Sequence, residues 1–219
     1  MARRSRAPSV PFDPEGFQRH LASAGLPIEL TDDALSLIGQ YLEMRQKWAR
    51  VHNLTGPQAS QDVLYRDLVD SVAVLTVLRG DQPLFDVGSG NGTPGLVLAC
   101  VWSEQPITLV EPISKRSAFL RTASVKMGLK HVQVINGRWP TELSQGAQVV
   151  SRAVAPVEVW PELAVEAGAH VDSFIRMLAA RRPPVNVSDF ECAVGVDYRL
   201  SDGVSRRIER WDRAVKPAV

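Results

Sequence analysis

The stretch LFDVGSGNGTPGLVLAC, residues 84–100, constrains the fold more than any other part of the chain. A short apolar run typical of a buried strand leads directly into three glycines at alternate positions, Gly88, Gly90 and Gly92. Glycine takes backbone dihedral angles that other residues avoid, and it lets a ligand approach the chain closely. A strand, a glycine loop and a helix in this order predict a ligand site beyond the carboxyl end of a strand in an α/β sheet.

The glycine spacing indicates which ligand this is. A dinucleotide site uses G-x-G-x-x-G, whereas Gly88, Gly90 and Gly92 give G-x-G-x-G, and Thr93 stands where the third glycine of the dinucleotide pattern would fall. The next apolar run, ITLVE, ends on Glu111, whose carboxylate can accept hydrogen bonds from both ribose hydroxyls. An acidic strand tip also occurs in NAD sites, but together with this glycine spacing it favours S-adenosylmethionine. A purely structural glycine turn is the alternative.

The rest of the chain predicts helices first and alternating strands and helices afterwards. Amphipathic patterns predict helices over 13–24, from Thr31 onward with Thr31 as the N-cap, and over 62–78. After Gly80, β-rich runs alternate with helical ones at 94–102, 114–127 and 157–168, and a further strand is expected over 173–178. The runs CAVGVDYRL and SRRIERW predict two closing strands. We therefore expect an α/β fold with a mostly parallel sheet and helices on both faces.

This pattern divides the chain into three parts. Residues 1–12 contain three arginines and two prolines and are expected to form a disordered basic tail, residues 13–80 a helical region packed on the sheet, and residues 81–219 the α/β domain. The net charge of +1 gives no global argument for nucleic acid or membrane partners, so any such argument rests on local clusters.

Composition also predicts a compartment and argues against a metal site. No secretory signal and no membrane-spanning apolar stretch is visible in the sequence. Cys100 and Cys192 fit no metal-ligand spacing, and Cys100 lies in an apolar run, where a buried thiol is expected. The four histidines are scattered. We expect a cytoplasmic protein, in a reducing compartment, without a metal centre.

Six segments of the chain are similar to one known family. These are KWARVHNLT, RDLVDSV, DVGSGNGTPGLVLA, EPISKRSAFLR, INGR and VVSRA, which follow one another in the same order between Leu35 and Ala155. The chain resembles the RsmG (GidB) family, whose members are S-adenosylmethionine-dependent methyltransferases of guanine N7 in small-subunit ribosomal RNA. The resemblance implies a class I, Rossmann-like methyltransferase fold with an N-terminal helical extension. It also implies ribosomal RNA or the small ribosomal subunit as partner, with no membrane partner, and a monomer is expected.

The resemblance also assigns the site, residue by residue. Gly88 and Thr93 match loop positions at the cofactor, Glu111 the acidic ribose position, and Trp139 with Pro140 the pair that lines the adenine. Arg152, in S-R-A, matches a residue in the cleft between cofactor and substrate and is the expected catalytic residue. The expected cofactor-binding residues are Asp86, Gly88, Gly90, Thr93, Glu111, Trp139, Pro140 and Arg152.

A local basic cluster is the expected RNA contact. Three basic residues, Lys115, Arg116 and Arg121, lie on the helix after Glu111. Arg138 and Arg152 follow later strands, and all five are expected to gather at the mouth of the cleft. Such a patch would hold phosphates and steer RNA. The alternative is a solvated helix face with arginines that form ion pairs to structural carboxylates.

Methyl transfer to guanine N7 requires few catalytic side chains. Guanine N7 carries an unprotonated lone pair, so no general base is required, and proximity and electrostatics suffice. In agreement, the fourth strand is not followed by the D/N-P-P-Y/F motif typical of exocyclic amine methylation.

Two positions depart from the family pattern. Asp67 stands where the family commonly has histidine in R-H-x-x-D-S, and a Leu-Lys-Gly segment on the fifth strand is missing. Arg176 or Arg181 is the candidate substitute for its lysine. Two alternatives follow: a divergent paralogue that methylates another substrate, or a non-catalytic descendant that binds RNA or protein.

Overall fold

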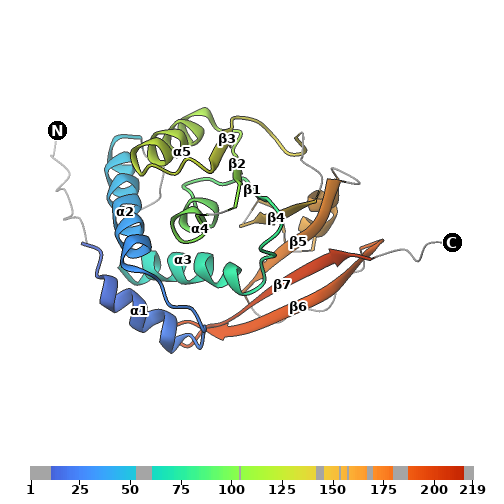
Figure 1. Cartoon of the computed structure of the whole chain (residues 1–219), viewed down its shortest axis with the longest axis horizontal. Helices are drawn as coiled ribbons and strands as arrows, with labels where there is room; N and C mark the ends of the chain where they lie inside the picture. The colour runs from blue at the N-terminus through green and yellow to red at the C-terminus, as the bar shows by residue number, and fades with distance from the viewer. Residues whose placement is uncertain are drawn as a thin grey trace, which may run out of the picture.

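The structure is a computed structural model that describes residues 11–52, 61–103, 105–141, 146–152, 154–156, 158–166, 170–179 and 187–214. Its described part contains a seven-stranded sheet in the order β3-β2-β1-β4-β5-β7-β6 (Figure 1). The first five strands are parallel, and β7 runs antiparallel to both β5 and β6. The strands are β1 (Leu84–Val87), β2 (Ile107–Val110), β3 (Val132–Ile135), β4 (Ala147–Ser151), β5 (Val171–Leu178), β6 (Phe190–Arg199) and β7 (Ser205–Arg213). The predicted mostly parallel α/β fold is confirmed.

The helices also follow the predicted order. Two differ in length: the helix expected to reach 78 ends at Ala73 and gives way to a 3-10 turn, and the helix expected over 157–168 begins only at Trp160. Residues 157 and 167–169 lie outside the described residues. The helices are α1 (Pro14–Ser23), α2 (Asp32–His52), α3 (Gln61–Ala73), η1 (Val74–Thr76), α4 (Gly95–Val101), α5 (Ser114–Lys126) and α6 (Trp160–Val165).

Side-chain caps mark where the first two helices begin. The Asp13 carboxylate accepts a hydrogen bond from the Gly16 amide at 2.9 Å, and Pro14 occupies the first helical position. The Thr31 hydroxyl accepts one from the Ala34 amide at 3.2 Å, as predicted. Both satisfy amides that have no partner inside the helix.

The strands alternate between two hydrophobic layers, because successive side chains point to opposite faces of a sheet. Leu84 of β1 belongs to a large core cluster that also contains residues of α1–α5, whereas Phe85 belongs to a second cluster with Trp160 of α6. Helices therefore cover both faces of the sheet. The N-terminal helices share the larger cluster with the sheet, and the division of the chain at residues 12 and 80 stays a prediction.

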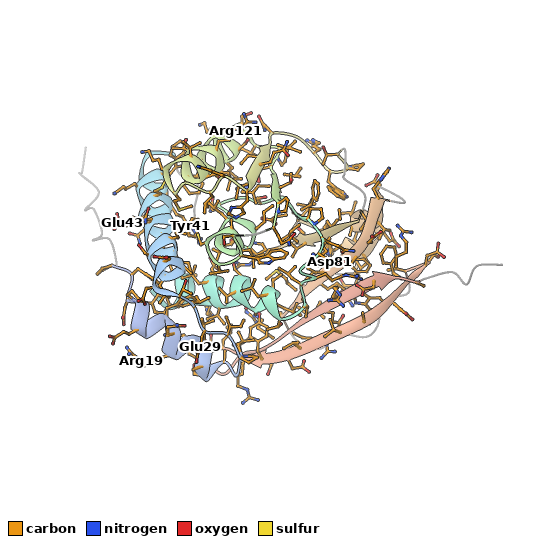
Figure 2. The ribbon with its side chains drawn as sticks, viewed as in Figure 1. Arg19, Glu29, Tyr41, Glu43, Asp81 and Arg121 are labelled. Atoms are coloured by element: carbon orange, nitrogen blue, oxygen red, sulfur yellow. The ribbon has the colours of Figure 1, made fainter. Side chains whose placement is uncertain are left out.

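Helix α2 has one buried face and one exposed face. Figure 2 shows Tyr41 on the side of α2 toward α4 and Glu43 on the opposite side. The Tyr41 side chain is fully buried, whereas Glu43 forms an exposed ion pair with Lys47, 3.3 Å away on the next turn. The buried face thus carries a tyrosine hydroxyl into the core beside the glycine loop.

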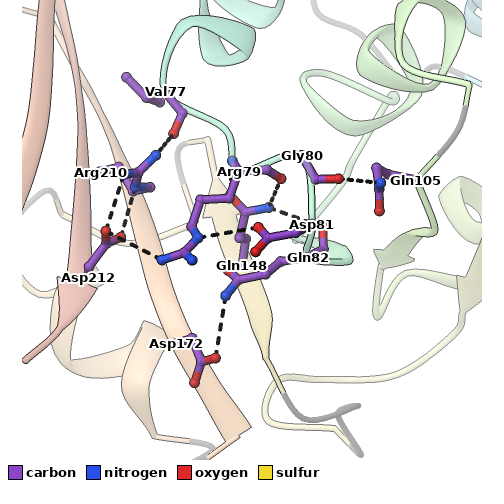
Figure 3. Close-up of polar contacts among 10 residues, drawn as sticks. All are labelled: Val77, Arg79, Gly80, Asp81, Gln82, Gln105, Gln148, Asp172, Arg210 and Asp212. Atoms are coloured by element: carbon purple, nitrogen blue, oxygen red, sulfur yellow. Dashed lines mark hydrogen bonds and ion pairs between the residues drawn. The ribbon is translucent and has the colours of Figure 1, made fainter. Parts of the chain in front are cut away.

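Polar contacts fasten the segment that joins the helical region to β1 (Figure 3). The buried Gln148 amide of β4 accepts a hydrogen bond from the Arg79 amide at 2.7 Å and donates to the carbonyls of Arg79, at 2.9 Å, and Gln82, at 3.1 Å. Arg210 of β7 donates to the Val77 carbonyl at 2.7 Å. These contacts lie at the amino ends of β1 and β4, which leaves the carboxyl ends for a ligand.

Candidate functional site

The register of the central strands brings three predicted residues together. Val87 of β1 pairs with Val110 of β2 on one side and with Ser151 of β4 on the other. The next residues in the chain are Gly88, Glu111 and Arg152, so they leave the sheet side by side. The order of the strands reverses between β1 and β4, which is where ligands bind in open α/β sheets.

The two glycines Gly88 and Gly90 both have positive φ, but they differ in the space that surrounds them. Gly88 has φ +69°, and a Cβ built there would lie 2.1 Å from the Val154 Cγ2 atom, so a side chain has no room. Gly90 has φ +54°, but a Cβ there would meet only the Gly88 carbonyl oxygen, at 3.7 Å. A side chain at Gly90 would therefore extend into open space beside the loop.

Glu111 ties this loop to the end of β2. Its side chain is buried, and its two oxygens accept hydrogen bonds from the Gly90 and Ile113 amides, each at 2.8 Å. A carboxylate has about four lone-pair sites, so each oxygen keeps acceptor capacity for a ligand. The predicted ribose-binding residue is thus also an organiser of the glycine loop.

One cavity of about 590 Å³ opens onto these residues. Eight predicted site residues line it: Gly88, Gly90, Thr93, Glu111, Arg116, Arg138, Trp139 and Arg152. Three do not line it: Asp86, Pro140 and Lys115. Pro140 and Lys115 are exposed, Pro140 directly after Trp139 and Lys115 in the first turn of α5.

Asp86 is placed behind the loop rather than at the cavity. Its carboxylate is fully buried and accepts a hydrogen bond from the Gly95 amide at 3.0 Å. Burial raises the pKa of Asp86 from 3.8 to about 7. The structure therefore gives Asp86 a supporting position at the start of α4, and its part in cofactor binding stays a prediction.

We expect Asp86 to make stability fall as the pH rises from about 4 to about 7. In this interval the unfolded carboxyl ionises while the buried one keeps its proton, so folding takes up a proton and the free energy of unfolding declines. Asp86→Asn cannot ionise and should flatten this decline, by up to ~4 kcal/mol at 1.36 kcal/mol per pKa unit. Urea denaturation of both proteins between pH 4 and 8 measures the difference, and parallel pH curves would contradict it.

Aromatic and aliphatic side chains form one wall of the cavity. The Trp139 indole donates a hydrogen bond to the Leu163 carbonyl at 2.6 Å, and its ring packs edge-on against Phe85. Trp160 and Val154 complete this wall. The sequence analysis missed Leu163, Trp160 and Val154, because their only signal was an apolar pattern that the core also produces.

Arg152 forms an ion pair with the residue that departs from the family pattern. Its guanidinium donates to Asp67 Oδ1, and Arg45 of α2 donates to Asp67 Oδ2 at 3.0 Å. Asp67 also lines the cavity. Within the predicted basic cluster, Arg152 has a carboxylate partner, whereas Lys115 and Arg138 are exposed at the surface, so their contact with RNA stays a prediction.

Arg176 is not a substitute for the missing lysine. It is buried in β5 and forms an ion pair with Glu209 of β7 at 3.0 Å, so it cannot reach an RNA. The error arises because an arginine in a strand gives no sign of the face to which it points. Arg181 lies outside the described residues.

Cys100 is buried in α4, as predicted, and burial raises the pKa of its thiol to about 12. Among the described residues, no group of three or more histidine, cysteine, aspartate or glutamate side chains is arranged to hold a metal ion. Within the same part of the chain, no helix has the length and apolar character needed to cross a bilayer.

Comparison with known families decides the class. Residues 34–181 match the family model GidB, described as rRNA small subunit methyltransferase G. The chain belongs to this family. Membership confirms the resemblance found in the sequence, the S-adenosylmethionine-dependent methyltransferase class and the cofactor.

Curated relatives carry the name ribosomal RNA small subunit methyltransferase G. That of Nitrosospira multiformis is 38% identical over 146 residues, which is 66% of this chain and 66% of the relative. That of Francisella philomiragia is 32% identical over 138 residues, 63% of this chain and 67% of the relative. The chain thus spans about two thirds of the length of these relatives.

Solved structures agree on the fold. The O-methyltransferase from Bacillus cereus in complex with SAH has a TM-score of 0.57 at 12% identity, and the match covers 92% of this chain and all of that one. TrmN from Thermus thermophilus has a TM-score of 0.53 at 15% identity over 78% of this chain and 53% of that one. These likenesses confirm the Rossmann-like methyltransferase fold.

Proposed function

We propose that this protein transfers a methyl group from S-adenosylmethionine to N7 of a guanine in small-subunit ribosomal RNA. The observation that carries the proposal is the single cavity onto which Glu111 and Arg152 both open. Family membership supports the substrate class, because the matched family is described as rRNA small subunit methyltransferase G.

The residues at this cavity fit the cofactor. A volume of about 590 Å³ lies within the range of small-molecule sites. The Glu111 carboxylate would accept hydrogen bonds from the ribose hydroxyls. The backbone of Gly88 and Gly90 allows the cofactor to approach closely. Trp139 and Ile113 offer apolar surface for the adenine. When bound, S-adenosylmethionine supplies an electrophilic methyl group on a sulfonium centre.

The substrate side of the cavity depends on Arg152. Its side chain is about one third exposed, and it leaves N–H donors free beyond the one that binds Asp67. A guanidinium can donate to guanine O6 or to a nearby phosphate while N7 stays free as the nucleophile. No proton has to be removed from N7, so orientation is the main task of this side chain.

Basic residues around the cavity would contact the RNA backbone. Arg116 and Arg138 line the cavity, and Lys115 is exposed on the same helix as Arg116. Phosphate contacts of this kind fix the position of an RNA and weaken as the salt concentration rises. We propose that the protein acts as a monomer in the cytoplasm, on ribosomal RNA or on the small subunit.

The direct test is transfer of a labelled methyl group. Purified protein is incubated with S-adenosylmethionine labelled in the methyl group and with small-subunit RNA or bare small subunits that lack the modification. We expect label in RNA, and nucleoside analysis should identify it as 7-methylguanosine. Label at another atom would favour a paralogue with a different substrate, and no label on any RNA or particle would favour a non-catalytic RNA- or protein-binding role.

Arg152→Lys should lower methyl transfer by at least about tenfold, which is ~1.4 kcal/mol of transition-state stabilisation. Lysine keeps the charge but cannot reproduce the planar fork that fixes orientation. Single-turnover methylation measures the rate, and a titration with S-adenosylhomocysteine should give nearly the same dissociation constant as for the wild type. Equal rates for the two proteins would remove Arg152 from the mechanism.

A further inference from the structure

A series of polar side-chain contacts connects the glycine loop with Arg152. The Tyr41 hydroxyl of α2 donates a hydrogen bond to the Asn91 carbonyl, in the loop, at 2.8 Å. Burial raises the pKa of Tyr41, against the opposing effect of the Arg45 guanidinium on the next turn, so the hydroxyl stays a donor. Arg45 in turn binds Asp67, and Asp67 binds Arg152.

Asp67 connects the two arginines in this series of polar contacts. Its two carboxylate oxygens are divided between two guanidiniums, Oδ2 to Arg45 and Oδ1 to Arg152. The side chains of Asp67 and Arg45 are only 12% and 11% exposed, so both are shielded from water. Charge-assisted hydrogen bonds are strong in such surroundings, and loss of the carboxylate would leave two positive charges facing each other.

The surrounding elements hold Asp67 from several directions. It lies on α3, whereas Arg45 comes from α2 and Arg152 follows β4. One turn further along α3, Asp70 accepts a hydrogen bond from the Tyr198 hydroxyl at 2.6 Å and forms an ion pair with Arg206, which fastens the helix to the β6–β7 hairpin. The carboxylate of Asp67 is therefore a fixed point at the wall of the cavity.

We propose that Asp67 is a positioning residue that fixes the Arg152 guanidinium at the cavity, with Arg45 as its fixed counter-ion. This inference rests on the proposed function, because it assigns Asp67 a part in orienting the substrate. One edge of the Arg152 fork is bound to Asp67, and the remaining N–H groups point to the guanine or phosphate of the substrate. The residue that departs from the family pattern thereby takes part in the site.

Asp67→Asn removes the charge at nearly constant volume and should lower single-turnover methyl transfer about tenfold at saturating RNA. The dissociation constant for S-adenosylhomocysteine should stay within about twofold of the wild type. Asp67→Glu keeps the charge and should recover part of the rate. In the double variant with Arg152→Lys, the two losses should be less than multiplicative, because both remove the same interaction.

A second readout does not depend on methylation. Arginine modification by phenylglyoxal, followed by peptide mass spectrometry, should proceed several-fold faster at Arg152 in Asp67→Asn than in the wild type. The matched control is Asp202→Asn, which removes the exposed ion pair of Arg66 on α3, 2.7 Å long, and should change neither rate. Thermal unfolding shows that each variant is folded.

The outcomes separate the two proposals. An unchanged transfer rate together with unchanged Arg152 reactivity in Asp67→Asn would overturn the positioning role. A wild type that methylates no RNA would count against the proposed function, while the reactivity of Arg152 would still decide whether Asp67 holds it. If Asp67→Asn does not fold, Asp67→Ser serves for the same two measurements.

Discussion

Gly90→Val should abolish detectable binding of S-adenosylmethionine while the protein stays folded. Gly90 lies on the cavity with φ +54°, and a Cβ there meets no side chain of the protein within 4 Å. The added isopropyl group would therefore occupy the space of the ligand, and the strained φ would pull the Gly90 amide away from Glu111. Isothermal titration calorimetry measures the affinity, with an expected loss of at least about 100-fold, or ~2.7 kcal/mol.

A matched control distinguishes the effect of backbone strain from that of a side chain in the ligand's space. Gly203, in the turn between β6 and β7, has φ +82° and no atom within 4 Å of an added Cβ, and it does not line the cavity. Gly203→Val should lose some stability and bind S-adenosylmethionine normally. Normal binding by Gly90→Val would mean that the site has been assigned to the wrong loop.

Glu111→Ala should weaken S-adenosylmethionine binding about 100-fold, or ~2.7 kcal/mol. Hydrogen bonds to a charged group contribute roughly 1.5–3 kcal/mol, and this change removes both the ribose acceptor and the acceptor of the Gly90 and Ile113 amides. Calorimetry with S-adenosylmethionine and with S-adenosylhomocysteine should give similar losses, because the two share the ribose.

Glu111→Gln is the control for volume. The amide keeps one oxygen acceptor, so either the Gly90 or the Ile113 amide loses its partner. We expect an intermediate affinity, between that of the wild type and that of Glu111→Ala. If Glu111→Ala bound as tightly as the wild type, the ribose would have to lie elsewhere.

The fold could be predicted because its signals are local. Short β-rich runs, helical periodicity and the cap at Thr31 depend on neighbouring residues, and they predicted nearly every helix and strand. The helix ends at 73 and 160 were missed because a 3-10 turn and a late helix start keep the same apolar pattern. Tertiary packing decided those ends.

The site was predictable only in part, for the same reason. The glycine loop and Glu111 could be placed because parallel strands end at one edge of the sheet. The ion pair of Asp67 with Arg152 joins residues 85 positions apart, and no pattern along the chain indicates it. The sequence also does not indicate where a side chain points: Asp86 points toward Gly95, and Arg176 points into the core.

The structure of the protein bound to S-adenosylhomocysteine tests the central claim most directly. The account predicts the ribose hydroxyls on the Glu111 carboxylate, the adenine against Trp139 and Ile113, and the sulfur at the end of the cavity that Arg152 lines. A ligand bound at another place, or with its ribose away from Glu111, would contradict it.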